Sequence, residues 1–396
     1  MESKMVKGRD NTDNSKNNIV ISVVMPCLNE EQSIAYCIDK AFEGIKSTGL
    51  RGEVVVSDNG SKDNSVKIAK SKGARVVHQP LRGYGNAYMK GITEAYGKYI
   101  VIGDSDKTYD FTDLKKFITP LTKGYDMVMG SRLKGKIMPG AMPWLHKYIG
   151  NPLLSWFLNV LFKTGISDSH CGMRSFTKDA FNRMHLKTTG MEFASEMVIN
   201  SSKAGLKIKE VAITLYANTD RKPHLRSFRD GWRHLRFMML YSPFHLFFLP
   251  GIISFLLGIM IFLGLMITRA DIYGLNLGPL SASLGSLLTI IGFQIITLGY
   301  FSKVAYSKIS SFDKELKGVI KIVDKLFVMG TSIIIASILF AAGFIINLAV
   351  LIRWIVLHYG GLSLINGVIS IFGITLIFLS VQLIFSSLFV NILKSE

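Results

Sequence analysis

The sequence lacks the cysteine spacings and recognition motifs that mark several common protein classes. It has three cysteines, Cys27, Cys37 and Cys171, with no C-x-x-C spacing. An odd number without that spacing argues against a disulfide framework and indicates reduced thiols in a cytosolic part. The sequence also has no zinc-finger spacing, RNP-like motif or basic-region heptad, so we expect no nucleic acid as a partner.

Acidic residues are few relative to basic ones. The chain has 28 Asp and Glu against 46 Lys and Arg, a formal net charge of +18, which favours anionic partners such as lipid headgroups and phosphates. Hydrophobic residues make up 49% of the chain and the mean hydropathy is +0.32. The chain is therefore too apolar for an ordinary soluble protein and too charged at its front for a wholly membrane one, and we expect two parts.

The front of the chain alternates between two kinds of segment. Residues 1–18 are polar and lack the apolar core of a signal peptide, which predicts a disordered cytosolic start. From residue 19, short apolar runs at 19–25, 53–57, 75–78, 98–102 and 126–129 alternate with helical patterns at 30–47, 65–72, 83–96 and 114–122. Such alternation predicts βαβ units and a mostly parallel, Rossmann-like α/β domain over residues 19–228.

Four long apolar stretches follow, at 247–267, 280–301, 327–352 and 364–390. Each reaches the roughly 20 residues that cross a bilayer, which predicts an all-α transmembrane domain of four helices over 247–396. The loop 302–326 carries six lysines, whereas the other two loops hold only Arg269 and Arg353. Because positive charge marks the cytoplasmic side, we expect a multi-pass protein of the cell membrane with the first domain and both termini in the cytosol.

Two shorter segments are apolar on part of their surface. In the segment 229–246, three apolar residues fall on one side of a helix and three arginines fall elsewhere around it: Trp232, Leu235 and Met239, and Arg229, Arg233 and Arg236. This pattern predicts a helix that lies in the membrane interface. The stretch 152–162 is too short to span a membrane, so it is either a buried core helix or a second interfacial one.

Two carboxylates end a predicted strand. Asp104 and Asp106 close the apolar run 99–103, and open α/β sheets bind ligands at the carboxyl ends of their strands. Carboxylate and phosphate oxygens together suit Mg²⁺ or Mn²⁺. The D-S-D turn therefore predicts a seat for a metal-bound nucleotide.

Two more polar turns follow the first and second predicted strands. They read P-C-L-N-E at 26–30 and S-D-N-G-S-K-D at 57–63. Each turn alone is typical of a helix cap or a tight turn. Because the carboxyl ends of parallel strands share one edge of the sheet, the three turns together predict one binding site.

The combination P-x-x-N-E, S-D-N-G-S-x-D and D-x-D resembles the catalytic domain of glycosyltransferase family 2, which has the GT-A fold. The resemblance continues at 81–87, 130–132 and 168–176 and covers about residues 20–240. These later motifs, with an arginine-rich segment before the membrane helices, look most like the polyprenyl-phosphate subgroup. That subgroup comprises dolichyl-phosphate mannose and glucose synthases and their bacterial undecaprenyl counterparts.

The resemblance implies roles at a nucleotide-sugar site. Four residues would contact the nucleoside: Pro26, Asn29, Glu30 and Asp58. Asp104 and Asp106 would hold Mg²⁺ or Mn²⁺ on the donor diphosphate. Thr108 or water would complete the shell, because this position departs from the amide common among the mannose synthases. Gly83 and Gly85 would let the backbone approach the ligand closely, with a simple turn as the alternative.

The implied reaction is attack by a lipid phosphate oxygen on the anomeric carbon of the sugar, with inversion. The partners would be a nucleotide sugar of the UDP-glucose or GDP-mannose type, a polyprenyl or dolichyl phosphate, and membrane lipids. Arg132 and Arg174 are expected to bind the acceptor phosphate, because guanidinium forks bind phosphate bidentately. Asp168 would orient Arg174 or share the metal. Lys222 and Arg226 would close over the site, or else pair at the surface or with lipid headgroups.

Other functions stay open at this point. A processive polysaccharide synthase would need a Q-x-x-R-W segment, and the sequence has none. A non-catalytic membrane scaffold or lipid transporter on a transferase fold is the other alternative, although intact Asp58, Asp104, Asp106 and Arg174 argue against decay. Glu196 either meets sugar hydroxyls or belongs to a solvated helix face. The identity of the sugar, the lipid and a homo-oligomer are left open.

Overall fold

A computed structural model of the chain describes residues 18–218, 227–242, 244–267, 271–272, 275–276, 278–307, 323–361 and 363–395. The chain divides into two compact units, Met1–Met238 and Met239–Glu396. The predicted boundary at residue 228 falls inside α9 (Ser227–Leu240), the helix in which the first unit ends. Most of the predicted disordered start lies outside the described residues.

The first unit is built on a seven-stranded sheet with the order β3-β2-β1-β4-β6-β5-β7. The strands are β1 (Ile21–Cys27), β2 (Gly52–Asp58), β3 (Arg75–His78), β4 (Tyr99–Ile102), β5 (Met127–Ile137), β6 (Arg174–Thr177) and β7 (Ile208–Leu215). Strand β6 runs antiparallel to β4 and β5, and the other pairs are parallel. The mostly parallel α/β fold is thus confirmed, with one antiparallel strand inserted.

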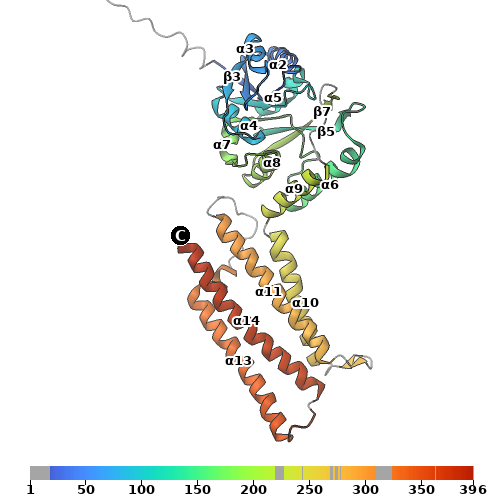
Figure 1. Cartoon of the computed structure of the whole chain (residues 1–396), viewed down its shortest axis with the longest axis vertical. Coiled ribbons are helices and arrows are strands. Elements are labelled where there is room, and N and C mark those ends of the chain that lie inside the picture. Colours follow the sequence, from blue (N-terminus) through green and yellow to red (C-terminus); the bar gives the residue numbers. More distant parts are fainter. Residues whose placement is uncertain are drawn as a thin grey trace, which may run out of the picture. The chain divides into compact units, whose positions relative to one another are not determined.

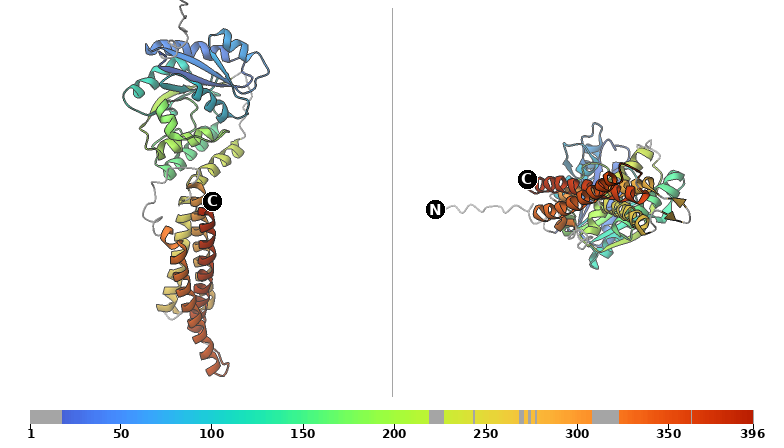
Figure 2. Two further views of the ribbon diagram at one scale, coloured as in Figure 1. Left: turned by 90° about the vertical axis from the view of Figure 1, so that its left-hand side faces the viewer. Right: turned by 90° about the horizontal axis from the view of Figure 1, so that it is seen from below.

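Helices cover both faces of this sheet (Figures 1 and 2). They are α2 (Ile34–Thr48), α3 (Ser65–Ser71), α4 (Tyr84–Glu94), α5 (Leu114–Thr122), α6 (Asn151–Phe162), α7 (Lys178–Met184) and α8 (Phe193–Lys203). Alternate residues of β1 face opposite sides, as in any strand. Val23 and Met25 belong to the core that includes residues of α2 and α5, whereas Val24 meets Gly91 of α4.

Helix α6, the apolar stretch expected to be either a core helix or an interfacial one, has one buried side and one exposed side. Leu158 and Phe162 are buried, as a core helix requires. Leu153, Trp156 and Val160 are exposed, with 58% of Trp156 accessible. The helix therefore contributes to the core with one side and leaves an apolar strip on the other, because nine of its twelve residues are apolar and a single core covers only part of its circumference.

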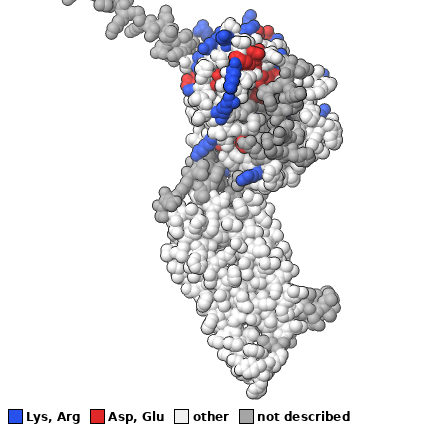
Figure 3. All heavy atoms as spheres, viewed as in Figure 1, with Lys and Arg blue, Asp and Glu red and all other residues white. Residues whose placement is uncertain are grey.

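Among its described residues the second unit contains four helices that are long and apolar enough to cross a membrane, as predicted, at His245–Ile267, Pro279–Val304, Met329–Val356 and Leu364–Lys394. They lie within α10 (Leu249–Ile267) with the short η3 (Phe244–Phe248), α11 (Pro279–Ser307), α13 (Met329–Val356) and α14 (Leu364–Ser395). Over most of its length, the face of this unit seen in Figure 3 shows uncharged atoms.

Glycines bring the helices of this unit close together in pairs. A Cβ at Gly258 of α10 would lie 2.5 Å from the carbonyl oxygen of Gly285 in α11, and one at Gly343 of α13 would lie 2.5 Å from that of Gly373 in α14. Small residues at such crossings allow the backbones to approach, which is how membrane helices gain packing. The helices therefore pack as α10 with α11 and α13 with α14 (Figure 1).

Candidate active site

The three predicted polar turns meet at one edge of the sheet. The parallel strands β1, β2 and β4 end at Cys27, Asp58 and Ile102. The backbone N–H of Asn59 donates to the carbonyl oxygen of Cys27 at 2.9 Å. The hydroxyl of Ser105, between the two aspartates, donates to the carbonyl oxygen of Pro26 at 2.6 Å. Direct hydrogen bonds thus join all three turns.

Asp58 is an ordered, ionised acceptor at this edge. Its carboxylate accepts the backbone N–H of Ser61 at 3.0 Å and that of Gly60 at 3.3 Å, and its Oδ2 lies 3.2 Å from Nδ1 of His78. Burial works to raise the pKa of Asp58, but these hydrogen bonds outweigh burial and lower it. Asp58 therefore carries a negative charge at neutral pH.

Asn29 fastens the first turn to the second. Its side-chain oxygen accepts the backbone N–H of Lys62 at 2.8 Å, and its own N–H donates to the Ser61 hydroxyl at 3.0 Å. Its φ is +57°, a left-handed conformation that Asn tolerates better than most residues. Glu30 begins the next turn, where its backbone N–H donates to Ser65. Pro26, Asn29, Glu30 and Asp58 are thus neighbours at one edge.

Asp104 is held by two tyrosines that the sequence reading missed. The hydroxyls of Tyr84 and Tyr88 donate to its Oδ1 at 2.9 Å and 3.1 Å. Burial, and then the negative charge of Asp106, raise the pKa of Asp104 to about 6. The signal for the tyrosines was their i,i+4 spacing, which puts both on one face of α4.

The two aspartates fit a hard divalent cation. Asp106 uses Oδ1 to accept the backbone N–H and the hydroxyl of Thr108, at 3.1 Å and 2.5 Å. Besides burial, the negative charge of Asp106 contributes to the raised pKa of Asp104. A cation bound between the two carboxylates would relieve their repulsion. Among the described residues no group of three or more His, Cys, Asp or Glu could hold a metal. Two neighbouring carboxylates are the donors that Mg²⁺ or Mn²⁺ usually takes from a protein, together with substrate phosphates, so Asp104 and Asp106 fit such an ion.

The two glycines of the G-Y-G turn serve a different contact from the one expected. A Cβ at Gly83 would lie 2.3 Å from the carbonyl oxygen of Thr189, and one at Gly85 would lie 2.3 Å from that of Thr188. The N–H of Asn86 also donates to the Thr189 carbonyl oxygen. The side of both glycines on which a Cβ would stand therefore faces the chain's own backbone, and their approach to a ligand stays a prediction.

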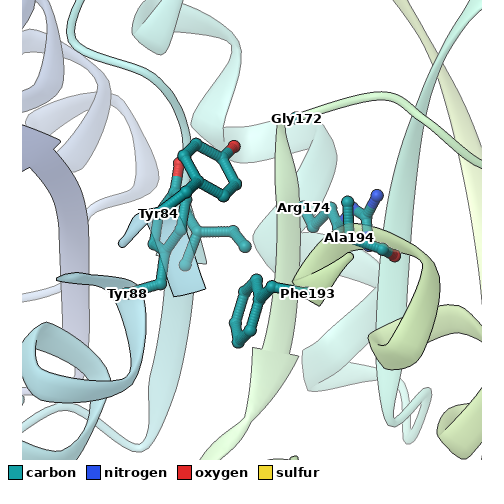
Figure 4. Close-up of a pocket in the computed structure, with 7 residues that line it drawn as sticks. Tyr84, Tyr88, Gly172, Arg174, Phe193 and Ala194 are labelled. Atoms are coloured by element: carbon teal, nitrogen blue, oxygen red, sulfur yellow. The ribbon is translucent and has the colours of Figure 1, made fainter. Parts of the chain in front are cut away.

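A small pocket adjoins Asp104. It is lined by Tyr84, Tyr88, Ile102, Gly172, Arg174, Phe193 and Ala194, and Figure 4 shows the tyrosines across the pocket from Arg174 and Ala194. Gly172 is required at its rim, because a Cβ there would lie 2.8 Å from Oδ2 of Asp104. The pocket is mainly aromatic and aliphatic, with the Asp104 carboxylate as its acidic neighbour.

Asp168 pairs with Arg132, which corrects the expected pairing with Arg174. Its two oxygens accept Nε and Nη2 of Arg132, each at 2.7 Å, and the backbone N–H of Arg132 at 2.9 Å. Both side chains are almost fully buried. Burial disfavours the guanidinium charge, but the hydrogen bonds to Asp168 outweigh it and raise the pKa of Arg132. The pair is thus a fixed, bidentate ion pair.

Arg174 is placed as a scaffold. It is 1% exposed, and its three nitrogens donate to the backbone carbonyl oxygens of Cys171, Ala194 and Ser169 at 2.8, 2.6 and 2.9 Å. A guanidinium engaged in this way positions the loop around it, so its placement does not support the expected contact with the acceptor phosphate. Lys222 and Arg226 lie outside the described residues.

Glu196 is buried, and its carboxylate binds backbone and hydroxyl donors of the chain itself. It is 1% exposed and accepts the backbone N–H groups of Lys187 and Thr188 and the Thr188 hydroxyl, at 2.6 to 3.1 Å. It therefore fixes the turn that packs against Gly83 and Gly85. Neither of the two roles expected for Glu196 fits this burial.

Comparison with known proteins bears on both units of the chain. The model of the family described as Glycosyl transferase family 2 matches residues 22–184. A second model, the glycosyltransferase family 2 C-terminal transmembrane region, matches residues 305–394. The two matches fall on the α/β unit and on the helical unit.

Two relatives from Haloferax volcanii are similar to this chain. The low-salt glycan biosynthesis hexosyltransferase Agl6 is 44% identical over 286 residues, 72% of this chain and 68% of the relative. A dolichyl-phosphate hexose transferase is 33% identical over 199 residues, 49% of this chain and 81% of the relative. Among solved structures, glucosyl-3-phosphoglycerate synthase from Mycobacterium tuberculosis is 22% identical, with a TM-score of 0.46 over 61% of this chain and 86% of that one.

Proposed function

The chain belongs to glycosyltransferase family 2, and from this premise we propose that it transfers a hexose from a nucleotide sugar to a polyprenyl or dolichyl phosphate on the cytosolic face of a membrane. The observation that carries the proposal is the meeting of Asp58, Asp104 and Asp106 at one sheet edge. The four apolar helices of the same chain and the dolichyl-phosphate hexose transferase relative support a lipid acceptor.

On the donor side, the residues divide between nucleoside and diphosphate. Asp58 accepts a base N–H, with Pro26, Asn29 and Glu30 beside it at the same edge. Asp104 and Asp106, with Thr108 next to them, would hold Mg²⁺ or Mn²⁺. When bound, this cation neutralises charge on the diphosphate and so stabilises the departing nucleoside diphosphate.

On the acceptor side, a phosphate oxygen of the lipid attacks the anomeric carbon. The bond from that carbon to the donor diphosphate breaks, its electron pair leaves with the nucleoside diphosphate, and the configuration inverts. A phosphate monoester has a second pKa of about 6 and is already mostly ionised at pH 7, so no strong general base is required. The need is charge control, because two anionic groups must approach each other.

Arg132 is the arginine that we retain for this charge control. Nε and Nη2 of its guanidinium donate to the carboxylate of Asp168. The third nitrogen, Nη1, makes no hydrogen bond to that carboxylate. Asp168 holds the guanidinium in one orientation, and Arg174 positions the loop that carries Asp168. Lys222 and Arg226 remain candidates for closing contacts, from sequence alone.

The test is transfer of radiolabelled sugar from a panel of UDP- and GDP-sugars to a short polyprenyl phosphate in detergent, with Mg²⁺, Mn²⁺ or EDTA. We expect one labelled, acid-labile lipid that is lost with EDTA and in Asp106→Ala, which should still fold because its carboxylate holds only the local Thr108 turn. A labelled polymer would favour a processive synthase. Donor binding without turnover would favour the scaffold.

A further inference from the structure

The first turn of α8 joins three parts of the candidate site. The ring of Phe193 stacks on Tyr88, with centroids 5.6 Å apart and planes 8° apart. The carbonyl oxygen of Ala194 accepts Nη1 of Arg174 at 2.6 Å. Glu196 fixes the turn behind the G-Y-G glycines. Three residues of one helical turn thus contact three parts of the candidate site: the tyrosines, the Asp168–Arg174 loop and the segment behind the G-Y-G turn.

Ser195, in the middle of this turn, connects the loop to α9. Its hydroxyl lies 3.0 Å from Nδ1 of His234 on α9 and 3.4 Å from Nε2 of His170. The two imidazole rings are 4.7 Å apart in an edge-to-face arrangement. Nδ1 of His170 lies 2.9 Å from the Ser169 hydroxyl. A series of polar contacts therefore runs from α9 into the loop that carries Asp168.

The surroundings of His170 favour the neutral form of its imidazole. Burial, and then the neighbouring His234, Arg132 and Arg174, lower the pKa of His170 well below its usual value. A neutral imidazole has one donor and one acceptor nitrogen, and a hydroxyl can donate to one group while it accepts from another. Ser195 can therefore bridge the two histidines, with His170 in its neutral form.

We propose that His234 is a positioning residue for the transfer reaction: through Ser195 and His170 it fixes the Asp168–Arg174 segment, and with it the Arg132 guanidinium that Asp168 holds. The first unit ends at Met238, so the helix that leads the chain into its membrane part is also the helix that sets this loop. The role in acceptor binding rests on the proposed function.

Three variants of the full-length protein in detergent test this role. His234→Ala removes the contact. His234→Asn restores it, because the Asn amide reaches the position of Nδ1. Arg236→Ala changes an exposed side chain of the same helix and is the control. We expect His234→Ala to raise KM for polyprenyl phosphate about 5- to 10-fold, the effect of one lost, partly buried hydrogen bond, with KM for the nucleotide sugar unchanged. His234→Asn should recover most of this loss.

Hydrogen exchange of the backbone over residues 168–174 gives a second readout that does not depend on activity. Exchange should be faster in His234→Ala, restored in His234→Asn and unchanged in Arg236→Ala. The inference is overturned if exchange in His234→Ala equals that of the wild type, if Asn rescues neither readout, or if Arg236→Ala has the same effect. Absence of any sugar transfer by the wild type would count against the proposed function alone, and exchange would then decide whether His234 holds the loop.

Discussion

Asp104, which we propose to be a metal ligand, carries a cost in stability. Two tyrosine hydroxyls and the tight approach of Gly172 fix its orientation. Burial and the nearby Asp106 raise its pKa to about 6. A folded protein that binds a proton more tightly than the unfolded chain is more stable at low pH, and that stability is lost as the pH rises through the folded pKa.

Asp104→Asn should therefore stabilise the metal-free protein at pH 7 while it abolishes transfer. A shift from 3.8 to about 6 corresponds to at most about 3 kcal/mol, and relaxation around the site reduces this to about 1–3 kcal/mol. The Asn side-chain oxygen still accepts the tyrosine hydroxyls, so the pocket keeps its shape. The measurement is the thermal midpoint in EDTA at pH 5 and pH 7, where the gain should be larger at pH 7.

Asp39→Asn is the control, because Asp39 is an exposed carboxylate paired with Lys72 at the surface. An exposed pair of this kind contributes about 0–1 kcal/mol, so this variant should show little change. A lower thermal midpoint for Asp104→Asn than for the wild type at pH 7 would contradict the conclusion that the charge of Asp104 destabilises the metal-free protein.

The sequence was sufficient to predict that Asp104 and Asp106 lie at the same sheet edge as Asp58, because both follow a buried strand and the carboxyl ends of parallel strands share an edge. It could not supply the partners of Arg132 or Asp168. These residues lie 36 positions apart, and their pairing depends on where the loop before β6 returns to the sheet. The roles of Tyr84 and Tyr88 could not be predicted for the same reason. Their spacing places them on one face of α4, but it does not show which residue that face contacts.

The G-Y-G turn before α4 has its form because another segment lies directly against it. The carbonyl oxygens of Thr188 and Thr189 occupy the space that side chains at Gly85 and Gly83 would take. From sequence, glycines next to a site suggest space for a phosphate, and only the packing of the 187–190 segment shows that the space is filled. Strand β6 was missed for a similar reason: its four residues are too short to show a period and lie within a conspicuous motif.

Gly85→Ala should destabilise the α/β unit by about 1–3 kcal/mol, because the added Cβ meets a backbone carbonyl oxygen that cannot move without the whole turn. Tyr84, next in the chain, would shift with it, so transfer should fall as well. The measurements are the thermal midpoint and the transfer rate of the purified variant.

Gly150→Ala is the matched control, because its Cβ would lie 3.6 Å from the nearest atom and its φ of −59° suits any residue. It should change neither quantity appreciably. Equal losses in both variants would mean that a methyl group at any glycine disturbs the protein, and the argument from the 187–190 contact would fail.

The division into an α/β unit and a helical unit could be predicted well from sequence, because hydropathy changes abruptly along the chain. Four apolar stretches gave four helices. The end of the first unit was harder to predict. The amphipathic pattern of α9 suggests an interfacial helix, and the structure also shows a hydrogen bond between His234 of this helix and Ser195 of the α/β unit. Amphipathic periodicity shows that a helix has an apolar face and does not say what covers that face.

The orientation of the chain across the membrane can be tested with introduced cysteines. Burial raises the pKa of Cys27 to about 11 and those of Cys37 and Cys171 to about 12, and all three thiols are buried. At neutral pH they are protonated and poorly reactive, because the thiolate is the nucleophile. The natural cysteines should therefore give a low background with a maleimide reagent and need not be removed.

Gly361→Cys and Lys394→Cys should then report opposite sides. Both positions are exposed; the first lies between α13 and α14, and the second lies near the end of α14. Since the lysine-rich loop 302–326 predicts the cytosolic side, α13 would lead outward and α14 back. A membrane-impermeant maleimide should label Gly361→Cys in intact cells and Lys394→Cys only after permeabilisation. The reverse pattern would put the catalytic unit outside the cell, where nucleotide sugars are not supplied by the cytosol, and would contradict the proposed reaction.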